Sequence, residues 1–325
     1  AGATNQNGHR NVTWTGAANV TQAASSTAPV LDLSDWIPLK SVPRADGGSR
    51  PLLMWKQWNL GSTGGNWAFG TVNAATRTAT AANRGRTVVV ANTFNDGVGT
   101  PARTYSLATT TTETFPVVRF DEPVLSVWTV GDSITSCSGL VTDTMSSWGH
   151  RACADVSDQT GIPVVHANFG VPSVTAADFW INAKAHLAAG VPPPSVLVLN
   201  AASINEVGST PDVRKLEMIR STAMDGLAIC RQYGIPYLIL MPMLPCESFA
   251  GATEDNLRKG LNSDMAITAS SYGVRVLDFS ALGNGASPEL WVPAYKFDAL
   301  HPNETAIEAV MTPVLRSALL GVLGR

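Results

Sequence analysis

Three residues in two short segments of this sequence could together form an activated nucleophile. Ser133 ends a Gly-Asp-Ser segment that directly follows the apolar run 124–130. Asp298 and His301 lie three residues apart near the end of the chain, in Asp-Ala-Leu-His-Pro-Asn. A serine hydroxyl beside a histidine that an aspartate orients is the arrangement of a covalent nucleophilic catalyst. If the fold brings the two segments together, the chemistry is that of a hydrolase.

The elements that would position these residues alternate along the second part of the chain. Five runs are almost wholly apolar, as in parallel strands that are buried on both faces. They cover residues 124–130, 164–168, 196–200, 237–241 and 274–278. Helical segments separate them, so the pattern predicts an α/β fold, a three-layer α/β/α domain with a parallel five-stranded sheet. Ligands bind at the carboxyl ends of such strands, and Ser133 follows the first strand there.

The clearest predicted helix lies between the third and fourth runs. Thr210 suits the N-cap position, Pro211 the first turn, and Gly234 the position just after the last turn. Its apolar residues recur at helical spacing, which predicts one face packed on the sheet.

Four short blocks, in a fixed order, make residues 124–325 resemble the SGNH hydrolases, also called the GDSL esterase/lipase family. The segment ending at Ser133 matches the nucleophile block, and the segment from Asp298 to His301 matches the last block. Asn168-Phe169-Gly170 and Ser203-Ile204-Asn205-Glu206 resemble the blocks that supply a glycine and an asparagine. The third block departs from the pattern, since Ala202 or Ser203 stands where glycine is usual and Glu206 replaces aspartate.

The resemblance implies a role for each residue. Ser133 would attack an ester carbonyl, His301 would accept and return its proton, and Asp298 would orient the imidazole. The oxyanion hole would consist of the backbone N–H groups of Ser133 and Gly170 and the side-chain amide of Asn205. No cofactor is implied, and no histidine and cysteine residues stand at the spacing of a zinc site, so we expect no metal.

Asp132 is the alternative to Asp298 as the acid of the triad. It adjoins the nucleophile in sequence, but on a tight turn its side chain should point away from Ser133. We therefore expect Asp298 to hold this role.

Residues 1–122 differ in composition and predict a separate β-sandwich or jelly-roll domain, with residues 1–30 as a loosely ordered lead-in. Short strand-like runs separated by Gly, Asn and Asp are typical of such folds. Trp55, Trp58 and Trp67 either stack on sugar rings or fill a small core. The catalytic domain would then cover residues 123–325.

The bulk composition limits the classes of partner. The net charge is −3 and only 14% of residues are charged, which disfavours nucleic acid. The abundance of Thr, Ser, Asn and Gly is common in secreted or surface proteins, and no run approaches the ~20 apolar residues of a membrane span. The oligomeric state stays open.

The four cysteines allow two interpretations. Pairing Cys137 with Cys153 and Cys230 with Cys246 would close two short loops. Four buried thiols in a reducing compartment are the other possibility.

Together these features predict a serine esterase that acts on short acyl esters, above all on O-acetyl groups of carbohydrate. A β-sandwich joined to a domain of this kind resembles carbohydrate esterases, and no lid-like apolar segment suggests long acyl chains. One alternative is a broad carboxylesterase or arylesterase acting on small soluble esters. The other is a glycan-binding surface or virion module without activity.

Overall fold

The second part of the chain forms one compact unit in the computed structural model. The structure describes residues 93–94, 103–104, 124–137, 147–175, 178–188, 190–200, 203, 205, 213–247 and 251–325. Of the expected β-sandwich, it describes only β1 (Thr93–Phe94) and β2 (Arg103–Thr104), which pair antiparallel. Trp55, Trp58 and Trp67 lie outside the described residues.

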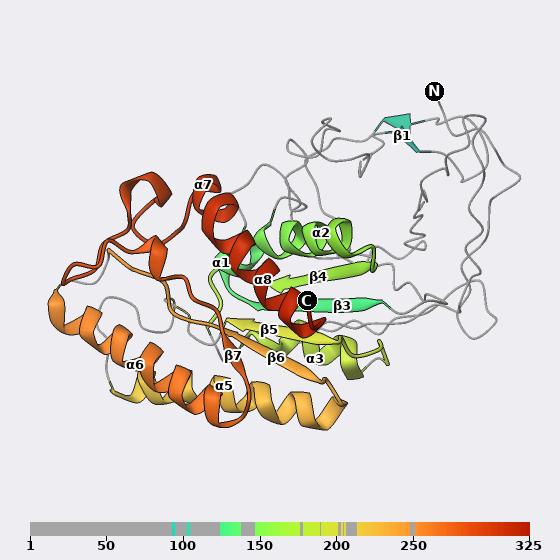
Figure 1. Cartoon of the computed structure of the whole chain (residues 1–325), viewed down its shortest axis with the longest axis horizontal. Coiled ribbons are helices and arrows are strands. Elements are labelled where there is room, and N and C mark those ends of the chain that lie inside the picture. The colour runs from blue at the N-terminus through green and yellow to red at the C-terminus, as the bar shows by residue number, and fades with distance from the viewer. Residues whose placement is uncertain are drawn as a thin grey trace, which may run out of the picture. The chain divides into compact units, whose positions relative to one another are not determined.

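Five parallel strands form the sheet of this unit (Figure 1). They are β3 (Leu125–Gly131), β4 (Val164–Gly170), β5 (Val196–Asn200), β6 (Tyr237–Met241) and β7 (Arg275–Val276). Their order is β4-β3-β5-β6-β7, so the chain passes from β3 to one side and then returns to the other. The predicted parallel α/β sheet is confirmed, and β3 lies at the switch point where such folds place their ligands.

Helices cover both faces of the sheet, because successive residues of the buried strands point to opposite faces. One core cluster contains Val127, Val196, Val198 and Ile239 and packs under α2 (Trp148–Thr160) and α8 (Thr312–Val322). The other contains Trp128, Leu197, Leu199 and Leu240 and packs under α3 (Trp180–Ala188), α5 (Val213–Tyr233) and α6 (Ala252–Ser271). The short elements are α1 (Ser133–Ser136), η6 (Ser280–Leu282), η7 (Pro293–Tyr295), α7 (Glu304–Ala306) and η8 (Ile307–Met311).

Helix α5 follows the sequence prediction closely at the end that the structure describes. It stops at Tyr233, and Gly234 adopts the positive φ of 67° that favours glycine after a helix. The predicted cap at Thr210 and Pro211 lies outside the described residues.

The helical stretch Glu304–Val322 is long and apolar enough, by length and composition, to cross a membrane. It is the only such helix among the described residues. Ile307, Met311, Leu315 and Leu319 are fully buried, recur every four residues and belong to the core cluster beside α2. This packing is that of a core helix.

The four cysteines are buried and form no disulfide. Cys230 lies in α5, and Cys246 lies in the loop after β6. Burial raises the pKa of the Cys137 thiol to about 12 and raises that of Cys153 further. Of the two interpretations of the cysteines, the structure thus agrees with four buried thiols and not with the pairing of Cys137 with Cys153 and of Cys230 with Cys246.

Candidate active site

The fold brings Ser133 and the Asp298–His301 turn together across 168 positions of sequence. Ser133 Oγ lies 2.9 Å from His301 Nε2. On the other side of the ring, His301 Nδ1 lies 2.9 Å from Asp298 Oδ2 and 3.0 Å from Asp298 Oδ1. The three side chains therefore form a continuous hydrogen-bonded relay from hydroxyl to carboxylate.

The start of α1 positions Ser133. Strand β3 ends at Gly131, Asp132 caps the helix, and Ser133 is its first residue, half-buried at the carboxyl edge of the sheet. A Cβ at Gly131 would overlap the Thr135 hydroxyl and lie 2.6 Å from the Cβ of Asn200, so only glycine allows this close turn. The indole N–H of Trp148 donates to the carbonyl of residue 134 at 3.0 Å and fixes the short helix from the core side.

A tight turn fixes the carboxylate of Asp298. Its Oδ1 accepts the backbone N–H groups of Leu300 and His301, both at 2.7 Å, as in an Asx turn. Partial burial raises the pKa of this carboxyl, but the His301 ring, the two N–H groups and the charge of His301 outweigh it and leave the pKa below its usual value. The carboxylate is thus held ionised and oriented toward the ring.

The side chain of Asp132 hydrogen-bonds away from Ser133, as the sequence predicts, and has a structural partner of its own. Its Oδ1 accepts the N–H of Ile134 at 2.9 Å, and its Oδ2 accepts the hydroxyl of Ser203 at 2.8 Å. Burial raises its pKa, against the hydrogen bonds from Ser203 and from the backbone of α1. The hydroxyl of Ser203 in turn accepts the N–H of Asn205 at 3.2 Å, so Asp132 links the first and third sequence blocks.

The predicted oxyanion donors have partners inside the protein. The N–H of Gly170 donates to Asn168 Oδ1 at 2.8 Å, and Asn205 Nδ2 donates to the carbonyl of Val174 at 3.0 Å. A Cβ at Gly170 would overlap the backbone N of Ser136 and lie 2.8 Å from its Cα. In this structure, the position needs glycine because α1 packs directly on it. The second amide hydrogen of Asn205 leaves that side chain able to donate elsewhere.

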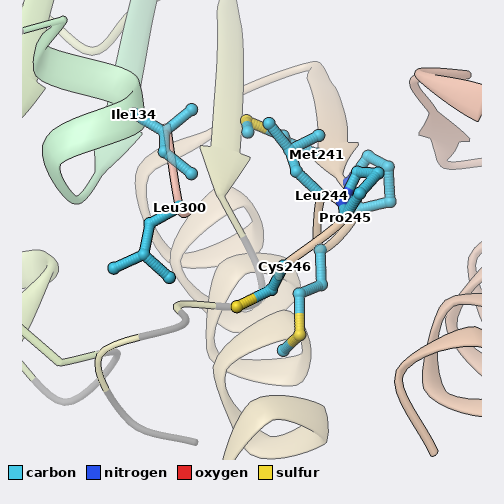
Figure 2. Close-up of a pocket in the computed structure, with 8 residues that line it drawn as sticks. Ile134, Met241, Leu244, Pro245, Cys246 and Leu300 are labelled. Atoms are coloured by element: carbon cyan, nitrogen blue, oxygen red, sulfur yellow. The ribbon is translucent and has the colours of Figure 1, made fainter. Parts of the chain in front are cut away.

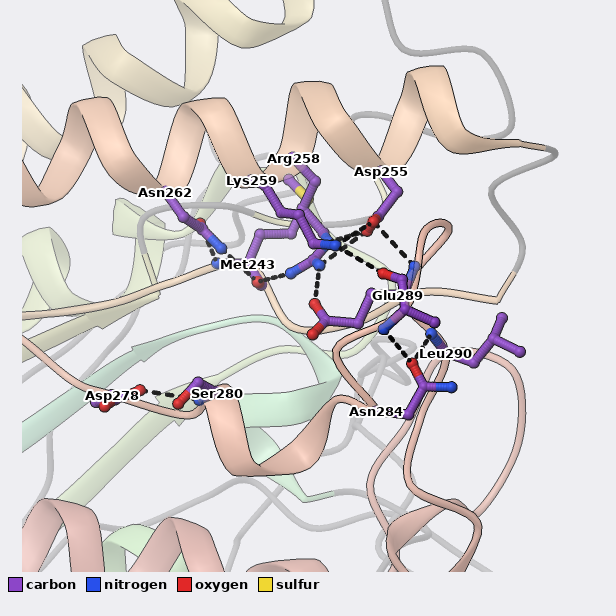
Figure 3. Close-up of polar contacts among 11 residues, drawn as sticks. Met243, Asp255, Arg258, Lys259, Asn262, Asp278, Ser280, Asn284, Glu289 and Leu290 are labelled. Carbon is purple, nitrogen blue, oxygen red and sulfur yellow. Dashed lines mark hydrogen bonds and ion pairs between the residues drawn. The ribbon is translucent and has the colours of Figure 1, made fainter.

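The loop after β6 connects the His301 turn with α6, a contact that no sequence pattern predicts. The N–H of Glu247 donates to the carbonyl of Ala299, between Asp298 and His301, at 2.9 Å. At the start of the same loop, Asn262 of α6 accepts the N–H and donates to the carbonyl of Met243, both at 2.9 Å. Side-chain bonds from α6 therefore fix the loop that supports the turn (Figure 3).

A buried ion-pair cluster holds this part of α6 (Figure 3). Arg258 is 4% exposed, bonds Asp255 Oδ1 at 2.8 Å, pairs with Glu289 and donates to the Met243 carbonyl at 3.2 Å. Asp255 Oδ2 also accepts the N–H of Glu289 at 2.9 Å and pairs with Lys259 at 2.8 Å. Every charge in the cluster has a partner, as a buried charge requires.

Within the described ranges, no group of three or more His, Cys, Asp or Glu residues could hold a metal ion.

No family model matches the sequence, and no curated protein does either. Solved structures with a similar fold include a member of the lipolytic protein G-D-S-L family from Veillonella parvula, with 16% identity and a TM-score of 0.47 over 61% of this chain and 98% of that one. Another is the esterase EstA from a Pseudoalteromonas species (14% identity, TM-score 0.43, 62% and 99%). A third is an acetylxylan esterase from Geobacillus stearothermophilus (18% identity, TM-score 0.43, 62% and 94%).

Proposed function

We propose that this protein is a serine esterase that hydrolyses short-chain acyl esters. The observation that carries the proposal is the relay in which Ser133 Oγ lies 2.9 Å from His301 Nε2 while Asp298 holds Nδ1. A hydroxyl in that position can pass its proton to the imidazole as it attacks, and the ionised carboxylate stabilises the imidazolium that forms.

The reaction follows from this geometry in two halves. Ser133 Oγ bonds to the ester carbonyl carbon as His301 takes the hydroxyl proton. The tetrahedral intermediate then breaks its bond to the alcohol oxygen, and His301 gives that oxygen the proton. In the second half, a water oxygen bonds to the acyl carbonyl carbon as His301 accepts its proton. The bond from that carbon to Ser133 Oγ then breaks, and His301 returns the proton to Ser133 as the free acid leaves.

The oxyanion would be stabilised by the N–H of Ser133 and the amide of Asn205. Gly170 completes the set only if its N–H leaves Asn168 Oδ1, because one N–H cannot serve both acceptors well. We therefore expect Asn205 to contribute more than Gly170, with a loss of about 10²–10³ in turnover when its amide is removed.

For the alcohol part of the ester we propose a carbohydrate. Phe297 stands directly before Asp298, is 59% exposed, and is fixed by a 3.0 Å bond from its N–H to the carbonyl of His301. An exposed aromatic ring on a rigid turn beside the base can stack on a sugar ring. A small aryl alcohol would stack there too, which is the broad-esterase alternative.

The test is hydrolysis of p-nitrophenyl acetate, butyrate and octanoate by the native protein, Ser133→Ala and Ser271→Ala. Ser271 is an exposed serine at the end of α6 whose hydroxyl bonds only within that helix, so it controls for the substitution itself. We expect turnover by the native protein and Ser271→Ala and none by Ser133→Ala. Activity that survives Ser133→Ala would refute the mechanism.

If the native protein hydrolyses none of these esters, acetylated oligosaccharides are tested next. Tight binding of glycans by both the native protein and Ser133→Ala, without release of acetate, would favour the binding-module alternative.

A further inference from the structure

Ser203 connects the neighbour of the nucleophile with Asn205, the expected oxyanion donor. Its side chain is fully buried. Its hydroxyl donates to Asp132 Oδ2 at 2.8 Å and accepts the backbone N–H of Asn205 at 3.2 Å. Asp132 directly precedes Ser133 in the chain. A hydroxyl that donates to one group and accepts from the other fixes the two relative to each other, and neither glycine nor alanine at this position would make either bond.

The hydroxyl of Ser203 has one hydrogen and two acceptors near it. The carbonyl of Val174 lies at 3.4 Å, outside the roughly 2.5–3.0 Å that is usual for an O–H···O bond, whereas Asp132 Oδ2 lies inside this range. The hydrogen therefore goes to Asp132. This leaves a lone pair of the hydroxyl for the N–H of Asn205, and leaves the carbonyl of Val174 to the side-chain amide of Asn205, which donates to it at 3.0 Å.

A second path ties Asn205 to the end of β3. Val174, which accepts its amide, belongs to the loop after β4. At the start of this loop, the N–H of Val171 donates to the carbonyl of Gly131 at 2.9 Å, two residues before Ser133. Asn205 is thus held beside the nucleophile at both its backbone and its amide, and its second amide hydrogen can donate to an oxyanion.

The nucleophile itself is fixed without Ser203. The carbonyl of Ile134 accepts the indole N–H of Trp148 at 3.0 Å, and the Ile134 side chain is 5% exposed. This side chain, Leu300 and residues 241–246 surround a pocket of only about 10 Å³ (Figure 2). Such a volume holds one water-sized group at most, so α1 has little room to shift toward that side. Loss of the Ser203 hydroxyl should therefore disturb Asn205 and leave α1 in place.

We propose that Ser203 is a positioning residue of the esterase, which holds the amide of Asn205 where the oxyanion forms. The inference rests on the esterase function proposed above and on Asn205 as an oxyanion donor. An oxyanion donor binds the transition state more strongly than the substrate, so a misplaced amide lowers kcat and leaves KM almost unchanged. Complete loss of such a donor costs about 10²–10³ in turnover, and we expect its misplacement to cost about tenfold.

The experiment is a double-mutant cycle on p-nitrophenyl acetate with Ser203→Ala, Asn205→Ala and the double variant. Because Ser203 acts through Asn205, we expect Ser203→Ala to lower kcat about tenfold in the native protein and less than about twofold in Asn205→Ala. KM should stay within about twofold throughout. Ser195→Ala is the matched control and should keep the native kcat. Its hydroxyl also accepts a backbone N–H, that of Ser126 at 3.3 Å, but at the start of β5, the opposite edge of the sheet from Ser133.

Two further measurements separate this role from a general loss of stability. Ser203→Gly removes the hydroxyl and adds no atom, and we expect it to show the same loss of kcat. In the native protein, the backbone N–H of Asn205 should exchange with deuterium at least about tenfold more slowly than an unprotected amide, because Ser203 accepts it. This measurement needs no variant, and exchange at the unprotected rate overturns the proposal.

The outcomes of the cycle distinguish this proposal from the one on which it rests. If Ser203→Ala costs the same with and without the Asn205 amide, its role is structural and the positioning role alone is overturned. If Asn205→Ala keeps the native kcat, Asn205 is no oxyanion donor and the positioning role falls, while the esterase function stands. A native protein as inert as Ser133→Ala on every ester overturns the esterase function, and the positioning role with it.

Discussion

At the scale of single residues, the carboxylate of Asp298 distinguishes a relay from a simple hydrogen bond. It accepts hydrogen bonds from the His301 ring and from two backbone N–H groups, which together hold it ionised and oriented toward the imidazole. An asparagine would keep the shape and most of these bonds. It would also present an N–H to Nδ1, which favours the tautomer whose Nε2 carries the proton and cannot accept one from Ser133.

We therefore expect Asp298→Asn to lower kcat by about 10³–10⁴ while leaving KM and the thermal midpoint nearly unchanged. The measurement is steady-state kinetics on p-nitrophenyl acetate with a parallel thermal melt. Asp278→Asn is the control, because Asp278 also accepts a backbone N–H two residues on, that of Ser280, at 3.0 Å (Figure 3). Equal losses in the two variants would mean that Asp298 acts only as a turn residue.

Asp132 is the aspartate next to Ser133 in sequence. In contrast to Asp298, we expect its replacement to lower the stability of the protein more than its activity. It is fully buried and accepts the Ile134 N–H and the Ser203 hydroxyl. Asp132→Ala would leave the N–H of Ile134 without its side-chain acceptor and the Ser203 hydroxyl with only the carbonyl of Val174 at 3.4 Å, and an unsatisfied buried donor costs about 1–3 kcal/mol. We expect a lower free energy of unfolding in urea titrations, and a smaller fractional loss of kcat than in Asp298→Asn. A variant as stable as the native protein would contradict this role.

At the scale of elements, helix α6 supports the Asp298–His301 turn through the loop after β6. The path runs from Asn262 to Met243, along the loop to Glu247, and from its N–H to the carbonyl of Ala299. Asn262 hydrogen-bonds both the N–H and the carbonyl of Met243, which lies just beyond the end of β6. A neighbouring strand would make the same two bonds. The loop is thus held in a strand-like position without a strand partner.

Asn262→Ala should release this loop, because both backbone bonds of Met243 to helix α6 are lost. We expect the amides of Met243 and Glu247 to exchange with deuterium at least about tenfold faster, since each loses a fixed acceptor or its support. Asn256→Ala, an exposed asparagine on the same helix, is the control. Unchanged exchange would show that the ion-pair cluster around Arg258 fixes the loop without Asn262.

At the scale of the whole molecule, the parts that sequence could predict are those that local pattern encodes. Apolar runs predicted the parallel sheet, and the Gly-Asp-Ser segment placed Ser133 at the end of β3. The contacts that fix the loop after β6 could not be predicted, because they join residues that lie far apart in the sequence. Asp255 and Glu289 of the ion-pair cluster, for example, are 34 positions apart and meet only once the sheet has formed. The same holds for Gly170, whose expected role was toward substrate but whose missing Cβ makes room for α1.

The acid stability of the folded unit depends on a histidine outside the site. His166 of β4 lies 3.0 Å from the Thr129 hydroxyl through Nε2, and its ring centroid lies 6.1 Å from that of His150. Burial, and secondarily the proximity of His150, lowers the pKa of His166 from 6.5 to about 3. Between those values the unfolded chain binds a proton that the folded protein does not, so stability falls as the pH falls through this window.

We expect the native protein to lose about 2 kcal/mol more unfolding free energy than His166→Gln when the pH is lowered from 7 to 5. Urea titrations at pH 7, 6 and 5 measure the difference. The carboxyls with lowered pKa, Asp255, Asp278 and Asp298, do not interfere, because their stabilisation is lost only as the pH falls below their ordinary value of 3.8. A glutamine can still hydrogen-bond Thr129, so any general loss of packing shifts all three titrations equally. Parallel pH dependences in the two proteins would show that His166 takes up its proton without unfolding, and that acid acts on this fold elsewhere.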